Sequence, residues 1–154
     1  MKKMNLPSNV RVASWLGARC VEAFIENNKL NDIRLQAFVN HISDLVYSRD
    51  VPEWDEKANQ LEVHGLGDPL PEELDHVFNL AELIDCVREI SASQIYVAFR
   101  PEIMLAYLKT SLSLSKIDLS EFNLRMMCDI STEREGFGDP LSDNIVQGFK
   151  FKRT

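Results

Sequence analysis

Histidines and their neighbouring carboxylates are the side chains of this sequence best suited to acid–base chemistry or metal binding. The chain has three histidines, and their spacing matches no zinc signature. His41 lies in a helical run, close to its apolar face. His64 and His76 flank an acidic loop, where Glu73 or Asp75 could orient an imidazole ring. We predict no catalytic residue, metal ligand or cofactor, and keep His64 and His76 for the alternative of a small enzyme.

Nucleophile chemistry has even less support. The three cysteines, Cys20, Cys86 and Cys128, are odd in number, far apart in sequence and flanked by apolar residues. This pattern predicts neither a disulfide framework nor a zinc site, and it favours three small buried residues in a reducing cytosol. The sequence also lacks the Gly-x-Ser-x-Gly motif of a serine nucleophile.

Two glycine-rich loops resemble each other. The segment from Gly65 to Leu70 reads GLGDPL, and the segment from Gly136 to Leu141 reads GFGDPL. A phosphate-binding loop is disfavoured because neither a dinucleotide fingerprint nor a P-loop is complete, and because the acidic residues around Asp68 would repel phosphate. We interpret both segments as loops that lead into a helix, with the aspartate as its cap and the proline at its first position.

The distribution of charge is more informative than any motif. The whole chain has a net charge of −7. Residues 50–76 contain nine acidic residues and a single base, Lys57, so the rest of the chain is close to neutral. Such a concentration of like charge attracts basic partners, although it is also typical of a solvated surface.

Trp54 stands between two carboxylates in this segment. If exposed, its ring has the character of an interface anchor; if buried, it fixes the segment to the core. We favour burial. The predicted partner-binding residues are Asp50, Glu53, Trp54, Asp55, Glu56, Glu62, Asp68, Glu72, Glu73 and Asp75.

Helical periodicity places these residues within a bundle. Apolar residues recur at intervals of three and four from Ser8 to about Asn28, and again up to Val46 with Asn31 or Asp32 as N-cap, so we expect a helical hairpin. A third helix is predicted from Asn79 to about residues 99–100, with Glu82 returning a capping hydrogen bond.

Less regular segments surround these helices. A helix beginning at Pro101 is expected to stop early, near Ser111. Residues 118–127 form another short helix, unless 124–130 are extended. Within 50–76 only short pieces such as 52–59 are expected to be helical, and Gln60–His64 alternate as in a short strand.

The predicted fold class is mainly α. We expect one compact domain, residues 1–154, built as a bundle of about five to seven helices with a long acidic, loop-rich excursion at 50–76. One or two short strands are compatible with the pattern. Residues 147–154 form a basic tail or an edge strand.

Several classes of partner are disfavoured. The net charge opposes direct binding to nucleic acid and to a membrane surface. No apolar stretch reaches the roughly 20 residues that span a bilayer, and polar residues after Pro7 interrupt any signal peptide, so a cytoplasmic protein is expected.

These observations favour an acidic protein-binding domain that occludes a basic partner. Small cytosolic immunity proteins that protect bacteria from nuclease toxins work in this way, and the chain is similar to them in size, acidity and helical character, without any motif in common. The alternatives are a small enzyme near the Gly65 and Gly136 loops, and an adaptor or self-assembling helical domain. Partner identity and oligomeric state stay open.

Overall fold

The computed structural model describes residues 5–151 and is mainly helical, as the sequence predicts. Eight α-helices lie in the described part, and five of them have nine residues or more. The helices are α1 (Val10–Asn27), α2 (Ile33–Ser43), α3 (Val51–Asn59), α4 (Glu72–Asp75), α5 (Leu80–Ala92), α6 (Pro101–Ser115), α7 (Leu124–Cys128) and α8 (Asp143–Gln147), with 3-10 turns η1 (Asp44–Val46) and η2 (Leu119–Glu121).

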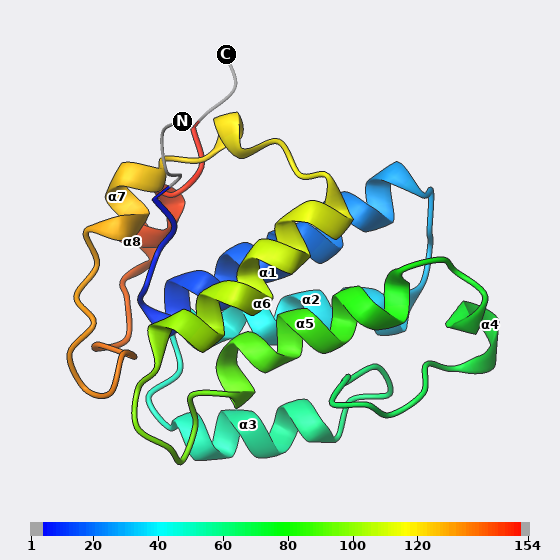
Figure 1. Ribbon diagram of the computed structural model, residues 1–154, viewed down its shortest axis with the longest axis horizontal. Coiled ribbons are helices and arrows are strands. Elements are labelled where there is room, and N and C mark those ends of the chain that lie inside the picture. The colour runs from blue at the N-terminus through cyan, green and yellow to red at the C-terminus, as the bar shows by residue number, and fades with distance from the viewer. Residues whose placement is uncertain (1–4, 152–154) are drawn as a thin grey trace.

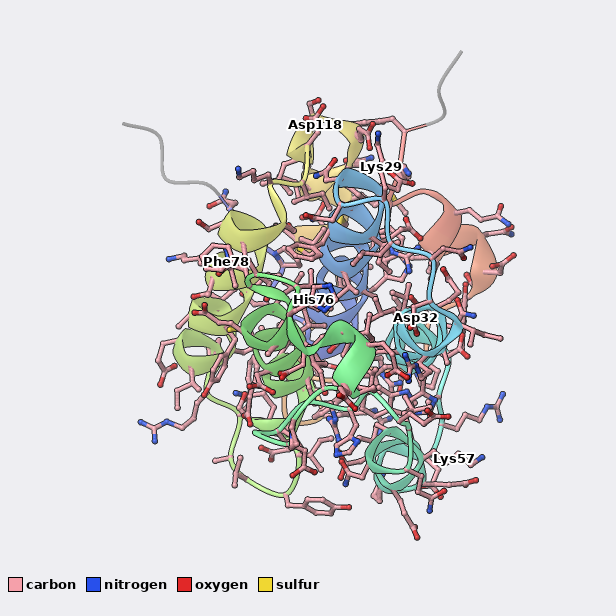
Figure 2. The ribbon with its side chains drawn as sticks, turned by 90° about the vertical axis from the view of Figure 1, so that its right-hand side faces the viewer. Lys29, Asp32, Lys57, His76, Phe78 and Asp118 are labelled. Atoms are coloured by element: carbon pink, nitrogen blue, oxygen red, sulfur yellow. The ribbon has the colours of Figure 1, made fainter. Side chains whose placement is uncertain are left out.

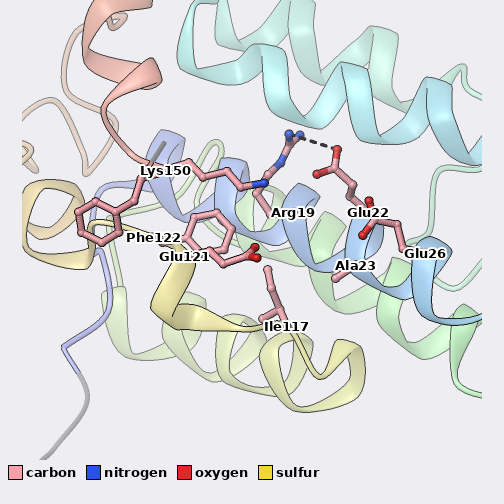
Figure 3. A pocket seen from close by; sticks show the side chains of 9 residues that line it. Arg19, Glu22, Ala23, Glu26, Ile117, Glu121, Phe122 and Lys150 are labelled. Atoms are coloured by element: carbon pink, nitrogen blue, oxygen red, sulfur yellow. Dashed lines mark ion pairs between the residues drawn. The ribbon is translucent and has the colours of Figure 1, made fainter. Parts of the chain in front are cut away.

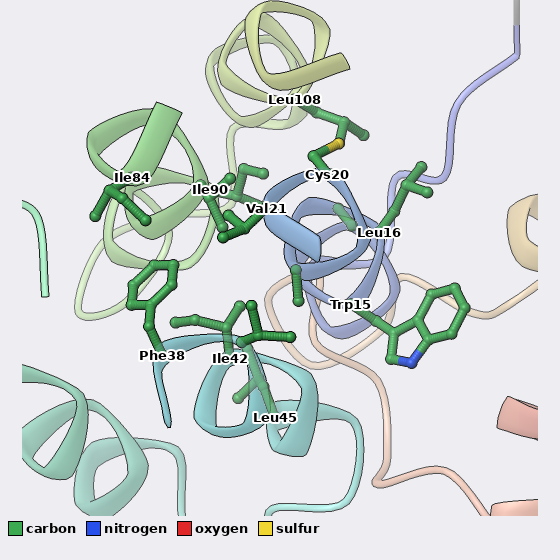
Figure 4. Packing of buried hydrophobic residues seen from close by; sticks show 14 of the residues in the cluster. Trp15, Leu16, Cys20, Val21, Phe38, Ile42, Leu45, Ile84, Ile90 and Leu108 are labelled. Atoms are coloured by element: carbon green, nitrogen blue, oxygen red, sulfur yellow. The ribbon is translucent and has the colours of Figure 1, made fainter. Parts of the chain in front are cut away.

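Helix α1 lies at the centre of the bundle. It packs against α2, α5 and α6, and α5 also packs against α6 (Figure 1). Figure 4 shows core side chains of α1 between those of α2 and α5, with Leu108 of α6 beside Cys20. Residues 10–18 are buried without a break, so the first half of α1 is covered all round rather than along the single stripe that was expected.

The predicted hairpin of α1 and α2 is confirmed by the contact between these helices. The Asp32 carboxylate accepts hydrogen bonds from the backbone N–H groups of Arg34 and Leu35, so it is the cap of α2. Apolar periodicity would place Ile33 on the buried face of α2, but its side chain at the first turn is 84% exposed, and burial begins at Leu35. Ala37 is exposed as well.

Helix α5 is shorter than predicted at its C-terminal end. It stops at Ala92, and the buried side chain of Gln94 then closes a turn. The Gln94 Oε1 accepts from the Arg100 N–H at 2.7 Å, and its Nε2 donates to the Arg100 carbonyl at 3.1 Å. These two hydrogen bonds hold residues 94–100 in a loop. At the other end, Asn79 has a positive φ of 70° and makes no side-chain cap, so the predicted capping box is absent.

Helix α6 is longer than predicted. It continues through the alternating segment to Ser115, with Ser111 and Ser115 on its buried side and Ser113 exposed. The Ser111 hydroxyl donates to the Tyr107 carbonyl at 2.9 Å, which satisfies the buried side chain within the helix.

No strand occurs in the described part of the chain. Gln60–His64 form a turn and bends instead of the short strand. Residues 118–127 divide into η2 and α7. Near the C-terminus a single antiparallel bridge joins Lys150 to Phe122, and Phe149 is fully buried at 5.4 Å from the Trp15 ring. Residues 152–154 of the predicted tail lie outside the described residues.

The two glycine loops do not cap helices in the way the sequence suggested. Helix α4 begins after Pro71 and α8 after Ser142, so each starts beyond the Asp-Pro pair. Asp68 contacts His64 instead, and Asp139 forms an ion pair with Arg134. What the loops share is positive φ at both of their glycines.

Two of these glycines separate the cost of a steric clash from the cost of an unfavourable backbone conformation when alanine replaces glycine. Gly136 has φ +89°, and a Cβ there would lie 2.3 Å from Cδ1 of Phe99, whereas Gly67 has φ +84° with nothing within 4 Å. We expect Gly136→Ala to lower the free energy of unfolding by about 3 kcal/mol and Gly67→Ala by only about 1 kcal/mol. Urea unfolding followed by circular dichroism measures both, and equal losses would contradict the packing argument.

Candidate functional site

One buried arginine joins the acidic segment to the bundle. Arg88 of α5 is 0% exposed, and its Nη2 donates to Asp55 and, at 3.1 Å, to Asn59, both on α3. Its Nη1 donates to the Ser91 hydroxyl at 3.0 Å, and the guanidinium lies 5.4 Å from the Trp54 ring centroid. Asp55, one of the predicted partner-binding acids, is therefore engaged in an internal ion pair.

Trp54 fixes the segment from inside. Its side chain is 4% exposed, which confirms the predicted burial. The indole Nε1 donates to the His41 carbonyl at 2.8 Å, and the two rings stack 5.1 Å apart with an interplanar angle of 8°. Because this contact covers its ring, Trp54 is a supporting residue and offers no surface to a partner.

His64 is held by acceptors on both sides of its ring. Nε2 lies 2.5 Å from Asp68 Oδ2, and Nδ1 lies 2.7 Å from the Leu61 carbonyl. The hydrogen bond to Asp68 raises the pKa of His64 most, and the hydrogen bond to Leu61 raises it further. Both favour the charged imidazolium, which can donate to the two acceptors at once. The neighbouring loop is tied to α5 by the Gly67 N–H, which donates to Asp85 at 3.2 Å.

The elements of the alternative enzyme site are not brought together. A Cβ on Gly65 would contact α5 at Arg88, whereas one on Gly136 would contact Phe99, so the two loops pack against different parts of the molecule. His76 has an exposed side chain. Two pockets described below lie beside Arg19 and beside Tyr96, and neither His64 nor His76 lines them.

Three further acids of the segment make local contacts at the surface. The Asp50 carboxylate caps α3 by accepting from the Glu53 N–H at 3.0 Å. Glu53 pairs with Lys57 at 3.1 Å, and Glu73 pairs with Arg34 at 3.3 Å. Both pairs are solvated, so they add little to stability.

The remaining acids of the segment are exposed and make no ion pair or side-chain hydrogen bond with any described residue. They are Glu56, Glu62, Glu72 and Asp75.

Sequence reasoning missed the acids that extend this surface onto α5. Glu82, Asp85 and Glu89 recur at intervals of three and four, which places them on one helical face. Burial raises the pKa of the Cys86 thiol that lies among them, and the negative charges of these three residues raise it further. Their spacing is the sequence signal that places them together, although they lie outside residues 50–76, where the net charge is concentrated.

Sequence reasoning also missed an exposed aromatic residue next to α4. Phe78 is 85% exposed. Figure 2 shows this end of the bundle, with His76 between Phe78 on one side and Asp32 on the other. No periodic pattern separates Phe78 from a buried phenylalanine, because it lies in the turn between α4 and α5.

A charged pocket of about 480 Å³ lies between α1 and the segment around Phe122 (Figure 3). Arg19 pairs with Glu22, one turn further along α1, at 3.4 Å, and Lys150 lines the same pocket. The Arg19 Nε is buried without a hydrogen-bond partner, and burial lowers the pKa of this guanidinium. Sequence analysis predicted no such site.

The cysteines behave as small core residues. All three are free, with Cys20 buried and the other two half-buried. Burial raises the pKa of the Cys20 thiol to about 12, so it is a poor nucleophile. Within residues 5–151, no group of three or more histidines, cysteines and carboxylates is arranged to hold a metal ion.

Comparison with known proteins finds no matching family, no matching curated sequence and no matching solved structure. Among the described helices, none is long and apolar enough to cross a membrane.

The Arg88 ion pair predicts opposite outcomes for two neighbouring acids. Asp55→Ala leaves a buried guanidinium without its carboxylate, so we expect a loss of about 3–5 kcal/mol in the free energy of unfolding. Glu56→Ala, next in sequence but exposed, is the control and should change it by about 0.5 kcal/mol or less. Urea denaturation measures both. Adding Arg88→Met to Asp55→Ala should restore part of the lost stability. Equal stability of Asp55→Ala and Glu56→Ala would refute the ion pair.

The His64 contacts predict a pH-dependent loop. Because the pKa of His64 is raised in the folded state, its contribution to stability is fully present below the ordinary histidine pKa and is lost as the pH rises through the folded value. NMR titration of the imidazole should give a raised pKa that Asp68→Asn lowers. Asp75→Asn is the control and should leave it unchanged; an unaltered pKa in Asp68→Asn would show that Asp68 is not the cause.

Proposed function

We propose that this chain is a protein-binding domain whose acidic segment, residues 50–76, occludes a basic surface on a partner protein. The observation that carries the proposal is the group of exposed carboxylates at Glu56, Glu62, Glu72 and Asp75, which have no basic partner among the described residues. Carboxylates concentrated in one segment without nearby bases leave a negative field for an incoming partner.

The way the segment is fixed supports this proposal. Arg88 and Trp54 hold α3 from inside, and Gly67 ties the following loop to α5. A surface fixed before binding loses less conformational entropy when it meets its partner. The carboxylates therefore act as a preformed pattern, which favours fast association with a complementary basic surface.

Phe78 supplies the exposed aromatic contact that the buried Trp54 does not offer to a partner. It is 85% exposed and follows the acidic helix α4 by three residues. Exposed aromatic side chains are enriched among the residues that dominate binding energy. In this proposal the carboxylates accelerate association and Phe78 slows dissociation.

The specific form of the proposal is an immunity protein that neutralises a nuclease-like toxin in the cytoplasm. A nuclease site carries cations that bind phosphates, and an acidic protein surface can occupy it in place of the nucleic acid. The free cysteines are compatible with a reducing compartment.

The test compares two variants of equal charge. Glu56→Gln, Glu62→Gln and Asp75→Asn together neutralise the segment, and Glu26→Gln, Asp129→Asn and Glu133→Gln neutralise three exposed acids elsewhere. Partners are captured from the native cells, including the products of neighbouring genes, and each purified partner is measured by surface plasmon resonance. We expect the first variant to associate about tenfold more slowly at low salt, with the difference lost at high salt, and the second to match the wild type.

Two further readouts make this test specific. Phe78→Ala should raise the dissociation rate while leaving the association rate nearly unchanged. The purified partner should be a nuclease that the wild-type protein inhibits on DNA or RNA. Equal binding by both triple variants would refute the acidic surface, and a partner without nuclease activity would refute only the toxin-inhibitor form.

A further inference from the structure

A second pocket, of about 670 Å³, lies beside Tyr96. It is formed by the start of α3, the turn between α5 and α6, and the loop at 134–138. Its volume is in the range of small-molecule sites. Its walls are mainly apolar, and they include Ile95, Val97 and Phe137.

One of the polar groups that line this pocket is a buried cation. Arg11 is 3% exposed and comes from the first turn of α1. Its Nε donates to the Phe137 carbonyl at 3.0 Å, and its Nη1 donates to the carbonyls of Leu45 and Ser48, both at 2.6 Å. Nη2 makes no hydrogen bond with a described residue, so it is the guanidinium nitrogen left for a ligand.

Arg11 also lacks a carboxylate partner of its own among the described residues. The opposing charge that acts on it is Asp139, and Asp139 already pairs with Arg134 at 2.8 Å. Burial lowers the pKa of Arg11, which reflects the cost of holding a cation out of water. A buried charge with only carbonyl acceptors is unusual, because buried charges are generally paired.

The rim of the pocket is exposed and strained. The side chains of Tyr96 and Val97 are 76% and 54% exposed, respectively. Tyr96, Arg134 and Glu135 all line the pocket, and all have positive φ, a conformation that non-glycine residues rarely adopt. Such residues gather at binding sites, where the surrounding structure enforces them.

We propose that this pocket binds a small monocarboxylate with an apolar body, its carboxylate on Nη2 of Arg11 and its body against Ile95, Val97 and Phe137. The ligand supplies the counter-charge that Arg11 lacks. A single negative charge fits better than a phosphate dianion, because Glu135 lines the same pocket and only one nitrogen of the buried Arg11 guanidinium is free. This activity is independent of the acidic surface.

The test uses decanoate as the carboxylate, with decanol as its uncharged counterpart, both below the concentrations at which they aggregate. Isothermal titration calorimetry on the full chain should show one saturable decanoate site and at least about tenfold weaker binding of decanol, the difference expected from a charge-assisted hydrogen bond. In NMR spectra the Nε–H resonance of Arg11 should shift with decanoate and not with decanol.

Two variants test the location. Val97→Glu places a negative charge at the exposed rim and should weaken decanoate binding at least about tenfold. Ile33→Glu makes the same kind of change at an exposed apolar residue that does not line the pocket, and it should bind as the wild type does. Absence of saturable binding, equal binding of decanol, or unchanged binding by Val97→Glu would each overturn the proposal.

Discussion

The requirement that a buried guanidinium be neutralised determines how the acidic segment sits on this bundle. Arg88 is fully enclosed, and its charge is met by Asp55 on α3, while Asn59 and Ser91 occupy other donors. Breaking such an arrangement costs far more than forming it contributes, because the remaining charge stays out of water. Helix α3 therefore cannot move away from α5 without separating Arg88 from Asp55 and leaving a buried charge unpaired. The loop that follows α3 starts at a helix held in place.

This constraint divides the acids of residues 50–76 by what they do. Asp55 is internal, Asp50 caps a helix, and Asp68 holds an imidazole ring, whereas Glu56 and Glu62 point to solvent without partners. The acids that organise the segment and the acids that are available to a partner are thus different residues. Their separation explains how a strongly acidic stretch can be ordered despite its own repulsion: part of its charge is compensated locally.

Sequence analysis was effective wherever the relevant interaction is local. Periodicity located α1 and α2, and side-chain chemistry narrowed the cap of α2 to Asn31 or Asp32, because both depend on residues within a few positions of each other. The end of α5 was misplaced because it depends on hydrogen bonds from Gln94 to Arg100 across a turn. The pocket at Arg11 was invisible to sequence analysis because its walls come from segments far apart in the chain. The burial of Arg88 has a weak signature in the sequence: it is a charged residue four positions after Ile84, on a helical face that is otherwise apolar.

The central position of α1 has a consequence for how the protein is made. Among the described helices, α1 leaves the ribosome before the others that cover it, and α5 and α6, which pack against it, are the last of the long helices to be synthesised. At about 5–20 residues per second, several seconds pass between the emergence of α1 and that of α6. Until α5 emerges, the elements available to shield α1 are mainly α2 and the turn η1. The nascent chain thus exposes an apolar helix, accessible to chaperones or to other chains, until its second half arrives.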